Sequence, residues 1–168
     1  MSHMQGTNYV GSMVVMEDGL PKKKEYRKFR IKKVIDNDDY AAMEEVIERR
    51  LRKFLEEKSK PVSERGSFAY APQLILVDGG KGQLTSAMKV LKKLNLTEEI
   101  PLAAIAKKHE EIFIPNISSP IRIPRGSEAL YLMQRIRDES HRFAISYHRQ
   151  LRNKAMVGSA LDGIPGLL

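Results

Sequence analysis

The stretch 72–83, which reads PQLILVDGGKGQ, decides the fold class. Residues 74–77 form a continuous apolar run, which is typical of a strand that helices cover on both faces. Two glycines follow Asp78 and end the strand, and apolar residues then recur at helical spacing over 83–94. A buried strand followed at once by a helix predicts an α/β domain with parallel strands.

Residue patterns also predict the other strands and helices of the chain. We expect strands at 10–16, 25–34 and 101–106, helices at 38–57 and from 127 to about 154, a β-ribbon from 112–114 and 121–123, and a loop at 58–71. The Glu-Asp-Gly sequence at 17–19 marks the turn of a hairpin with one basic face. The order predicts a mixed β-sheet flanked by helices, in which crossover helices join parallel strands.

Composition narrows the class of protein and its partners. The 168 residues suit one domain, and 29 Lys and Arg against 21 Asp and Glu leave a formal net charge of +8. The excess gathers in 22–33 and 135–154, which favours a polyanion such as nucleic acid, an anionic membrane surface or an acidic partner. A merely solvated basic surface is the alternative. The absence of cysteine excludes disulfides and thiolate metal sites and favours a reducing cytoplasm. No apolar run approaches the roughly 18–20 residues that cross a bilayer.

Asp78 is the first candidate site residue. Ligands of open α/β sheets collect at the carboxyl ends of strands, and Asp78 ends the predicted buried strand. The glycines allow close approach, while Lys81 and the following helix N-terminus favour a phosphate. An Asp that only caps the helix is the alternative. A P-loop is not supported, because the Gly-x-x-x-x-Gly-Lys-Ser/Thr spacing is absent.

A second candidate constellation, RDESHR at 137–142, lies on the last predicted helix. Asp138, His141 and His148 share one side of that helix, where a carboxylate and an imidazole could bind a metal or position water. Arg137, Arg142 and Arg149 could pair with phosphates. A solvated helix face with ion pairs is the alternative. No compact three-ligand set is present, which argues against zinc catalysis.

Together these segments resemble the C-terminal half of the UvrC family of DNA-repair excinucleases. The resemblance spans nearly the whole chain in the family's order and is carried by the following segments: SHMQG at 2–6, GSMVV at 11–15, EDG at 17–19, YRKF at 26–29, DDY at 38–40, LVDGGKGQ at 76–83, AKK at 106–108, RIRDESHRFA at 135–144, YHR at 147–149 and LDGIPG at 161–166.

The resemblance implies a ribonuclease-H-like endonuclease domain. In this family the domain makes the incision 5′ to a DNA lesion with a divalent metal, Mg²⁺ or Mn²⁺, and an Asp-Asp-His triad. The second Asp corresponds to Asp78, which is also the expected metal ligand, and the His to His141. The remaining candidates are four supporting acids, Asp38, Asp39, Asp138 and Glu139, and five phosphate contacts, Lys81, Lys107, Arg137, Arg142 and Arg149.

The chain also departs from the family's pattern. The family's first catalytic Asp would stand immediately before Met1, at the end of a first strand. The GIY-YIG nuclease domain, the UvrB-binding segment and most of the tandem helix-hairpin-helix unit are missing too. We therefore expect a nuclease domain at 1–155, the start of a truncated helix-hairpin-helix segment at 156–168, and little or no nuclease activity. Without the first strand, 72–78 should have an unpaired edge.

The expected partners are damaged double-stranded DNA and, in the full-length protein, UvrB and the UvrA-loaded complex, with a cytoplasmic location and no membrane partner. Two other functions stay open from the sequence. A non-catalytic DNA-binding or scaffold domain would use the same basic surface without cleaving DNA. A small-molecule phosphotransfer or nucleotide-binding enzyme would use Asp78 and its glycines, although it lacks a Walker or Rossmann signature.

Overall fold

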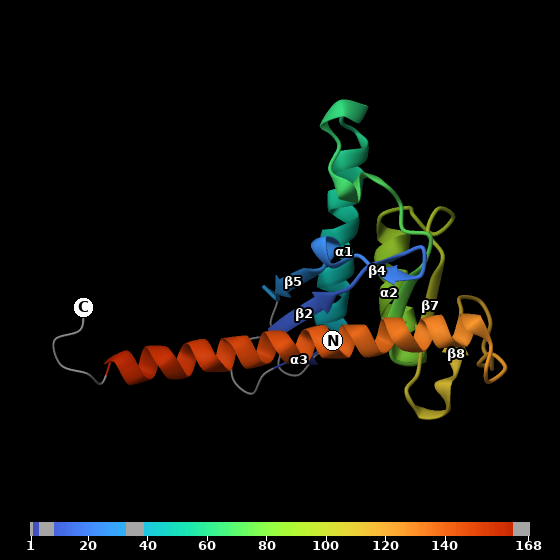
Figure 1. Cartoon of the computed structure of the whole chain (residues 1–168). Coiled ribbons are helices and arrows are strands. Elements are labelled where there is room, and N and C mark those ends of the chain that lie inside the picture. The colour runs from blue at the N-terminus through green and yellow to red at the C-terminus, as the bar shows by residue number, and fades with distance from the viewer. Residues whose placement is uncertain (1, 4–8, 33–38, 163–168) are drawn as a thin grey trace.

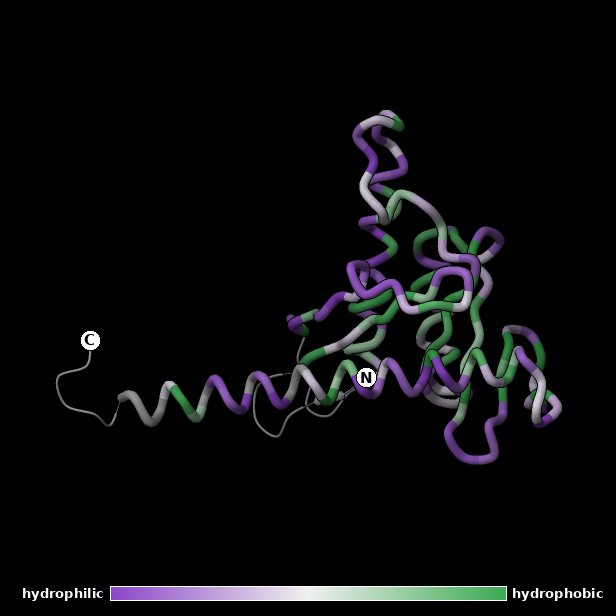
Figure 2. The backbone as a smooth tube through the Cα atoms, viewed as in Figure 1, coloured by the Kyte–Doolittle hydropathy of each residue, from purple (hydrophilic) through white to green (hydrophobic). Residues whose placement is uncertain are grey.

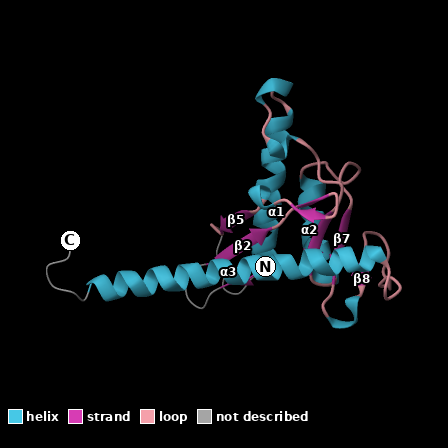
Figure 3. Ribbon diagram, in the orientation of Figure 1, coloured by secondary structure: helices cyan, strands magenta, loops and turns pink. Residues whose placement is uncertain are grey.

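The computed structural model describes residues 2–3, 9–32 and 39–162. Figures 1 and 3 show helices crossing over small sheets in a mixed α/β arrangement. The described residues form two three-stranded sheets, one two-stranded ribbon and three α-helices, α1 (Asp39–Lys58), α2 (Lys81–Lys93) and α3 (Glu128–Asp162). Among these residues, no helix is long and apolar enough to span a membrane.

The stretch 72–83 contains β6 (Ile75–Asp78), which pairs in parallel with β7 (Leu102–Ile105). Helix α2 makes the crossover between them, and β8 (Ile112–Phe113) adds an antiparallel strand to β7. The predicted mixed sheet is therefore confirmed for this part of the chain. Strand β6 is an edge strand of this sheet in the described structure, with β7 as its neighbour, as expected for a strand with an unpaired edge. The predicted ribbon partner at 121–123 contributes a single bridge from Ile121 to Ile112.

Among the described residues, the predicted antiparallel hairpin forms a sheet separate from the β6–β8 sheet. Its central strand β2 (Tyr9–Met13) pairs antiparallel with β5 (Arg27–Arg30) and with β1 (Ser2–His3). The strand predicted for 10–16 ends at Met13, because the chain leaves the ladder to form a second ribbon from β3 (Met16–Glu17) and β4 (Leu20–Pro21). Asp18 and Gly19 both take positive φ there, as a two-residue hairpin turn requires.

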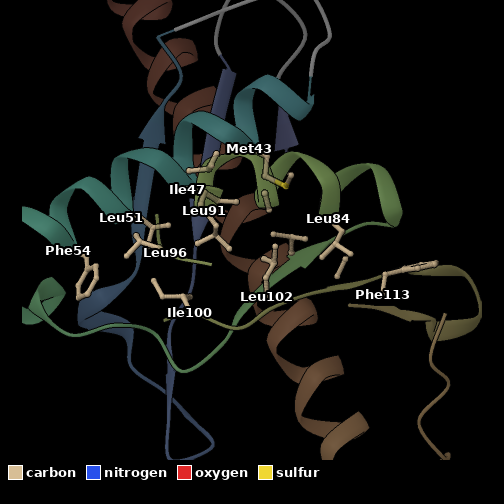
Figure 4. Close-up of a cluster of buried hydrophobic side chains, with 14 residues drawn as sticks. Met43, Ile47, Leu51, Phe54, Leu84, Leu91, Leu96, Ile100, Leu102 and Phe113 are labelled. Atoms are coloured by element: carbon tan, nitrogen blue, oxygen red, sulfur yellow. The ribbon is translucent and has the colours of Figure 1, made fainter. Parts of the chain in front are cut away.

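Helix α1 begins and ends within one residue of its predicted bounds and holds the two sheets together. Its Met43, Ile47, Leu51 and Phe54 pack on α2 and the β6–β7 sheet, as Figure 4 shows. Its Ala42 and Val46 pack on the hairpin instead. Figure 2 shows hydrophobic segments, in green, where α1, α2 and the strands meet.

The segment after α1, predicted as a loop, contains two short 3-10 turns, η2 (Val62–Glu64) and η3 (Ser67–Ala69). The carboxylate of Glu57 accepts a hydrogen bond from the backbone N–H of Gly66 at 2.9 Å and fixes this loop to the end of α1. The loop is therefore folded back on its own helix.

Helix α3 lies across the molecule, and its C-terminal half extends beyond the remaining elements in Figure 1. Its first turns pack on the β7–β8 sheet through Met133, and Leu130 nearby is buried. Further along, Phe143 meets Tyr26 of the hairpin segment with ring centroids 5.1 Å apart. The helix runs without interruption past residue 155, where we predicted a domain boundary, and the Gly-Ile-Pro-Gly sequence at 163–166 lies outside the described residues.

Candidate active site

Asp78 is held in place by the backbone on both sides of it. It pairs in register with Ile105, and the N–H of Gly79 donates to the carbonyl of Ile105 at 2.9 Å. Gly79 has a φ of +148°, a conformation that side chains other than glycine rarely adopt. The N–H of Gly80 then donates to the Gln83 side chain at 2.9 Å, which closes the first turn of α2. Asp78 thus sits at the carboxyl end of a parallel strand, beside a helix N-terminus.

Helix α3 brings His141 to Asp78 from 63 positions along the sequence: His141 Nε2 contacts Asp78 Oδ2. The helix can do so because it bridges the two sheets, with Met133 on one and Phe143 against the other. The side chains of His141 and Asp78 are 46% and 26% exposed, so both remain open to solvent and to a substrate. The structure therefore places the two predicted catalytic residues together.

Arg137 lies one turn before His141 on the same face of α3. Its side chain is only 13% exposed, its Nε lies 3.6 Å from Asp138 Oδ1, and its Nη1 is buried without a hydrogen-bond partner among the described residues. A buried guanidinium N–H without a partner is unfavourable. Asp138 itself is 74% exposed, so its pairing with Arg137 lies at the surface.

Glu139 and Arg142 have a different environment from the one predicted. Arg142 donates to Glu139 through Nε at 2.8 Å and Nη2 at 2.6 Å, and the Tyr26 hydroxyl donates to Glu139 at 3.0 Å. The hydrogen bond from Arg142 is the main cause that lowers the pKa of Glu139 to about 2. Burial and the bond to Glu139 raise the pKa of Tyr26 to about 12. The hydrogen bonds among Tyr26, Glu139 and Arg142 therefore link α3 to the hairpin segment.

Lys81 and Lys107 are exposed near the carboxyl ends of β6 and β7, which meet at one edge of the sheet. Asp39 is the first residue of α1; the neighbouring Tyr40 lies so close to Gly82 that a Cβ there would strike its hydroxyl. The N-termini of α1 and α2 are therefore adjacent.

The other predicted contacts lie further away or outside the described structure. Arg149 is exposed on α3 and lies eight residues beyond His141, about 12 Å along the axis. Asp38 falls outside the described residues.

The donors at this site suit a hard divalent cation in kind, since Asp78 offers carboxylate oxygens and His141 an imidazole nitrogen. Within the described ranges, no group of three or more His, Cys, Asp or Glu side chains comes close enough to hold a metal ion. Any ion bound here by the described residues would need further ligands from water or substrate.

Sequence reasoning missed Tyr26 as part of this region. It belongs to the YRKF segment that marks the family, but no sequence pattern pairs it with a residue 113 positions away. Its environment arises only when α3 packs on the hairpin.

Comparison with known proteins gives a consistent picture. A sequence model described as the UvrC RNase H endonuclease domain matches residues 1–145. The UvrABC system protein C of an Arthrobacter species is 46% identical over 193 residues, which cover 99% of this chain and 29% of that protein. Its counterpart from Mycolicibacterium paratuberculosis is 47% identical over 175 residues, covering 99% and 27%. The chain therefore spans less than a third of these relatives.

Proposed function

The chain belongs to the family of UvrC RNase H endonuclease domains, and from this membership and the Asp78–His141 contact we propose that it cuts DNA in nucleotide excision repair. The proposed reaction is hydrolysis of a phosphodiester bond 5′ to the lesion. The observation that carries the proposal is the meeting of a strand-end carboxylate and an imidazole on a solvent-accessible surface of a basic chain. Both groups are of the types that phosphodiester hydrolysis requires.

Mg²⁺ or Mn²⁺ is the proposed cofactor, with Asp78 as its ligand from this chain. When bound, such an ion offsets negative charge on the phosphate and lowers the pKa of water. Two described donors are few for a cation that takes six or more oxygens. We therefore expect weak metal binding and little or no cutting by this chain, except at high metal concentration.

The side chains around the metal ligand have separate proposed roles. His141 would orient water or protonate the leaving 3′-oxygen, because an imidazole can both accept and donate a proton and Asp78 aligns its ring. The guanidinium of Arg137 would donate its unpartnered Nη1–H to a phosphate oxygen. Lys81 and Lys107 would hold neighbouring phosphates without reading bases.

Damaged duplex DNA is the proposed substrate. UvrB and the UvrA-loaded complex are the proposed partners of the whole protein, and its proposed location is the cytoplasm. The matched relatives carry the name UvrABC system protein C, and the net charge of +8 suits a polyanionic substrate. A non-catalytic DNA-binding domain remains the second candidate, because the same basic surface would bind DNA without cutting it.

The test is metal-dependent nicking of a labelled duplex that contains a bulky lesion. Asp78→Asn removes the charge that binds a cation but keeps the side chain's shape, so we expect cutting to fall at least about 100-fold. His141→Ala should lose a similar factor, because general acid–base catalysis contributes about 10²–10⁴-fold. Asp18→Asn makes the same chemical change in the β3–β4 turn, away from the site, and should leave the rate unchanged.

Two outcomes would contradict the proposed catalysis. Unchanged cutting by Asp78→Asn would place the active site elsewhere. DNA binding by the wild-type chain without cutting at any concentration of Mg²⁺ or Mn²⁺ would favour the non-catalytic domain.

A further inference from the structure

A second basic site lies on the other half of α1. An open cleft of about 490 Å³ is formed between β5, the C-terminal half of α1 and the η3 turn. The charged side chains that line it are Arg27, Lys28, Arg49, Arg50, Lys53 and Glu57. Five cations therefore face a single carboxylate.

That carboxylate is already neutralised by other groups. Glu57 accepts the Gly66 N–H at 2.9 Å, and its Oε1 lies 3.0 Å from Lys60 Nζ and 3.2 Å from Lys53 Nζ. The hydrogen bond from Gly66, followed by those from Lys60 and Lys53, lowers the pKa of Glu57 to about 2. Its charge is thus engaged in fixing the loop. Arg49 pairs with Glu45 at 3.3 Å, whereas Arg27 and Arg50 form no ion pair with a described residue.

Arg50 shows this lack of compensation most clearly. Its guanidinium carbon lies 4.0 Å from the centre of the Phe68 ring, and Arg27 lies 4.8 Å from the same ring. Its Nη1 is buried, and no described residue accepts a hydrogen bond from it. Burial lowers the pKa of Arg50; the charge of Glu25 opposes this shift, and the charge of Arg27 adds to it. Two like charges on one aromatic ring, one with an unpartnered buried donor, form a site that an anion would stabilise.

We infer that this cleft binds a phosphate of the DNA backbone at a distance from Asp78, an inference that rests on the proposed function for the nature of the substrate. Guanidinium groups match phosphate oxygens in a bidentate geometry. A single small anion would pair with Arg50 and Arg27 alone. A polyanion that follows the surface of β5 and α1 would also contact basic side chains outside the cleft, and its phosphates carry no sequence information.

The structure also sets the spacing between the two sites. Tyr40 at the start of α1 lies against Gly82, close to Asp78, and Arg50 follows ten residues later. At 1.5 Å per residue this is about 15 Å along the helix. Duplex DNA advances about 3.4 Å per nucleotide along each strand. A duplex that runs parallel to α1 would therefore place a phosphate about four or five nucleotides from the cut against the cleft.

The experiment compares two arginines of the same helix. Arg50→Gln removes one charge from the cleft, and Arg52→Gln removes one from an exposed side chain that pairs with Glu48 outside it. Affinity for a fluorescent duplex is measured by anisotropy in the presence of a chelator, so that binding is separated from cleavage. We expect Arg50→Gln to raise Kd about tenfold and to reduce the log–log salt slope by about one. Arg52→Gln should change Kd less than about twofold.

Further variants keep the test decisive. Arg50→Lys retains the charge but not the planar fork, so the salt slope should stay while Kd rises to an intermediate value. If Arg50→Gln fails to give a wild-type circular dichroism spectrum, Arg27→Gln replaces it with the same expectation. Equal affinities of the cleft variant and Arg52→Gln would overturn the inference, even if the chain cuts DNA. A loss of DNA affinity in the cleft variant alone would support the inference, even if the chain does not cut DNA.

A free anion is distinguished by inorganic phosphate. Phosphate could stabilise the wild-type chain but not Arg50→Gln, while the DNA affinity of Arg50→Gln stays unchanged. This result would overturn the inference and show that the cleft is a site for a small anion. A methylphosphonate four or five nucleotides from the cut removes one backbone charge from the DNA. It should lower the DNA affinity of the wild-type chain but not that of Arg50→Gln. An equal loss of affinity for both proteins would place that contact outside the cleft.

Discussion

Replacing Gly79 by alanine should both destabilise the chain and disturb the candidate active site. Gly79 directly follows Asp78 and has a φ of +148°. A Cβ at this position would lie within 3.0 Å of the Gln83 side chain, the group that accepts the Gly80 N–H. The substitution therefore strains the backbone and displaces the side chain that closes the first turn of α2.

Two terms set the size of the effect. A residue other than glycine in a sparsely populated φ/ψ region costs about 1–3 kcal/mol, and losing the Gln83 hydrogen bond costs about 0.5–1.5 kcal/mol. The lower entropy of the unfolded alanine chain offsets about 0.4–1 kcal/mol. The net loss is about 0.5–4 kcal/mol of unfolding free energy. For a chain of this length each kcal/mol lowers Tm by about 2–4 °C, so Tm should fall by roughly 1–16 °C.

The assay is thermal unfolding followed by circular dichroism. Gly126→Ala is the matched control, because Gly126 also has a positive φ of +84° but nothing lies within 4 Å of its hypothetical Cβ. The Tm of Gly126→Ala should fall by the cost of backbone strain alone, and the Tm of Gly79→Ala should fall further. Gly79→Ala combined with Gln83→Ala should lose the steric part of the difference. A Gly79→Ala protein as stable as wild type, with unchanged activity, would refute the role given to this turn.

Three further perturbations test the packing. Leu51→Ala opens a cavity at a side chain with 0% exposure and should lower the unfolding free energy in urea by about 2–5 kcal/mol; a loss below about 1 kcal/mol would contradict the assigned core. The pKa of Glu57 is depressed to about 2, so its contribution to stability is present above the usual value of 4.5 and is lost as pH falls toward 2. Glu57→Gln should flatten the pH dependence of Tm in that window, and an unchanged acid limb would speak against the Gly66 contact. In alkaline absorbance titrations, Tyr26→Phe should remove the tyrosine that titrates near pH 12; persistence of that step would assign it to another tyrosine.

Much of the local structure was predictable from residue patterns. The helix at 39–58 and the strand at 75–78 follow from apolar periodicity and from the glycines that end the strand, which act over a few residues. The separation of the hairpin from the β6–β8 sheet was not predictable, because strand pairing depends on contacts between distant segments. The pairing of Glu139 with Tyr26 and Arg142 was missed for the same reason, and a helix-face pattern alone favoured a site role for these groups.

The family, the α/β class and the two residues expected at the centre of the site, Asp78 and His141, were predictable from the residues alone. Segment order and motif identity are properties of the chain and do not depend on tertiary contacts. That α3 crosses between the sheets and sets His141 against Asp78 follows from the packing of distant segments. This packing also leaves a donor of Arg50 buried without a partner in the described part of the chain. Burial and compensation of charge depend on which surfaces meet, and helix and strand periodicity do not specify that.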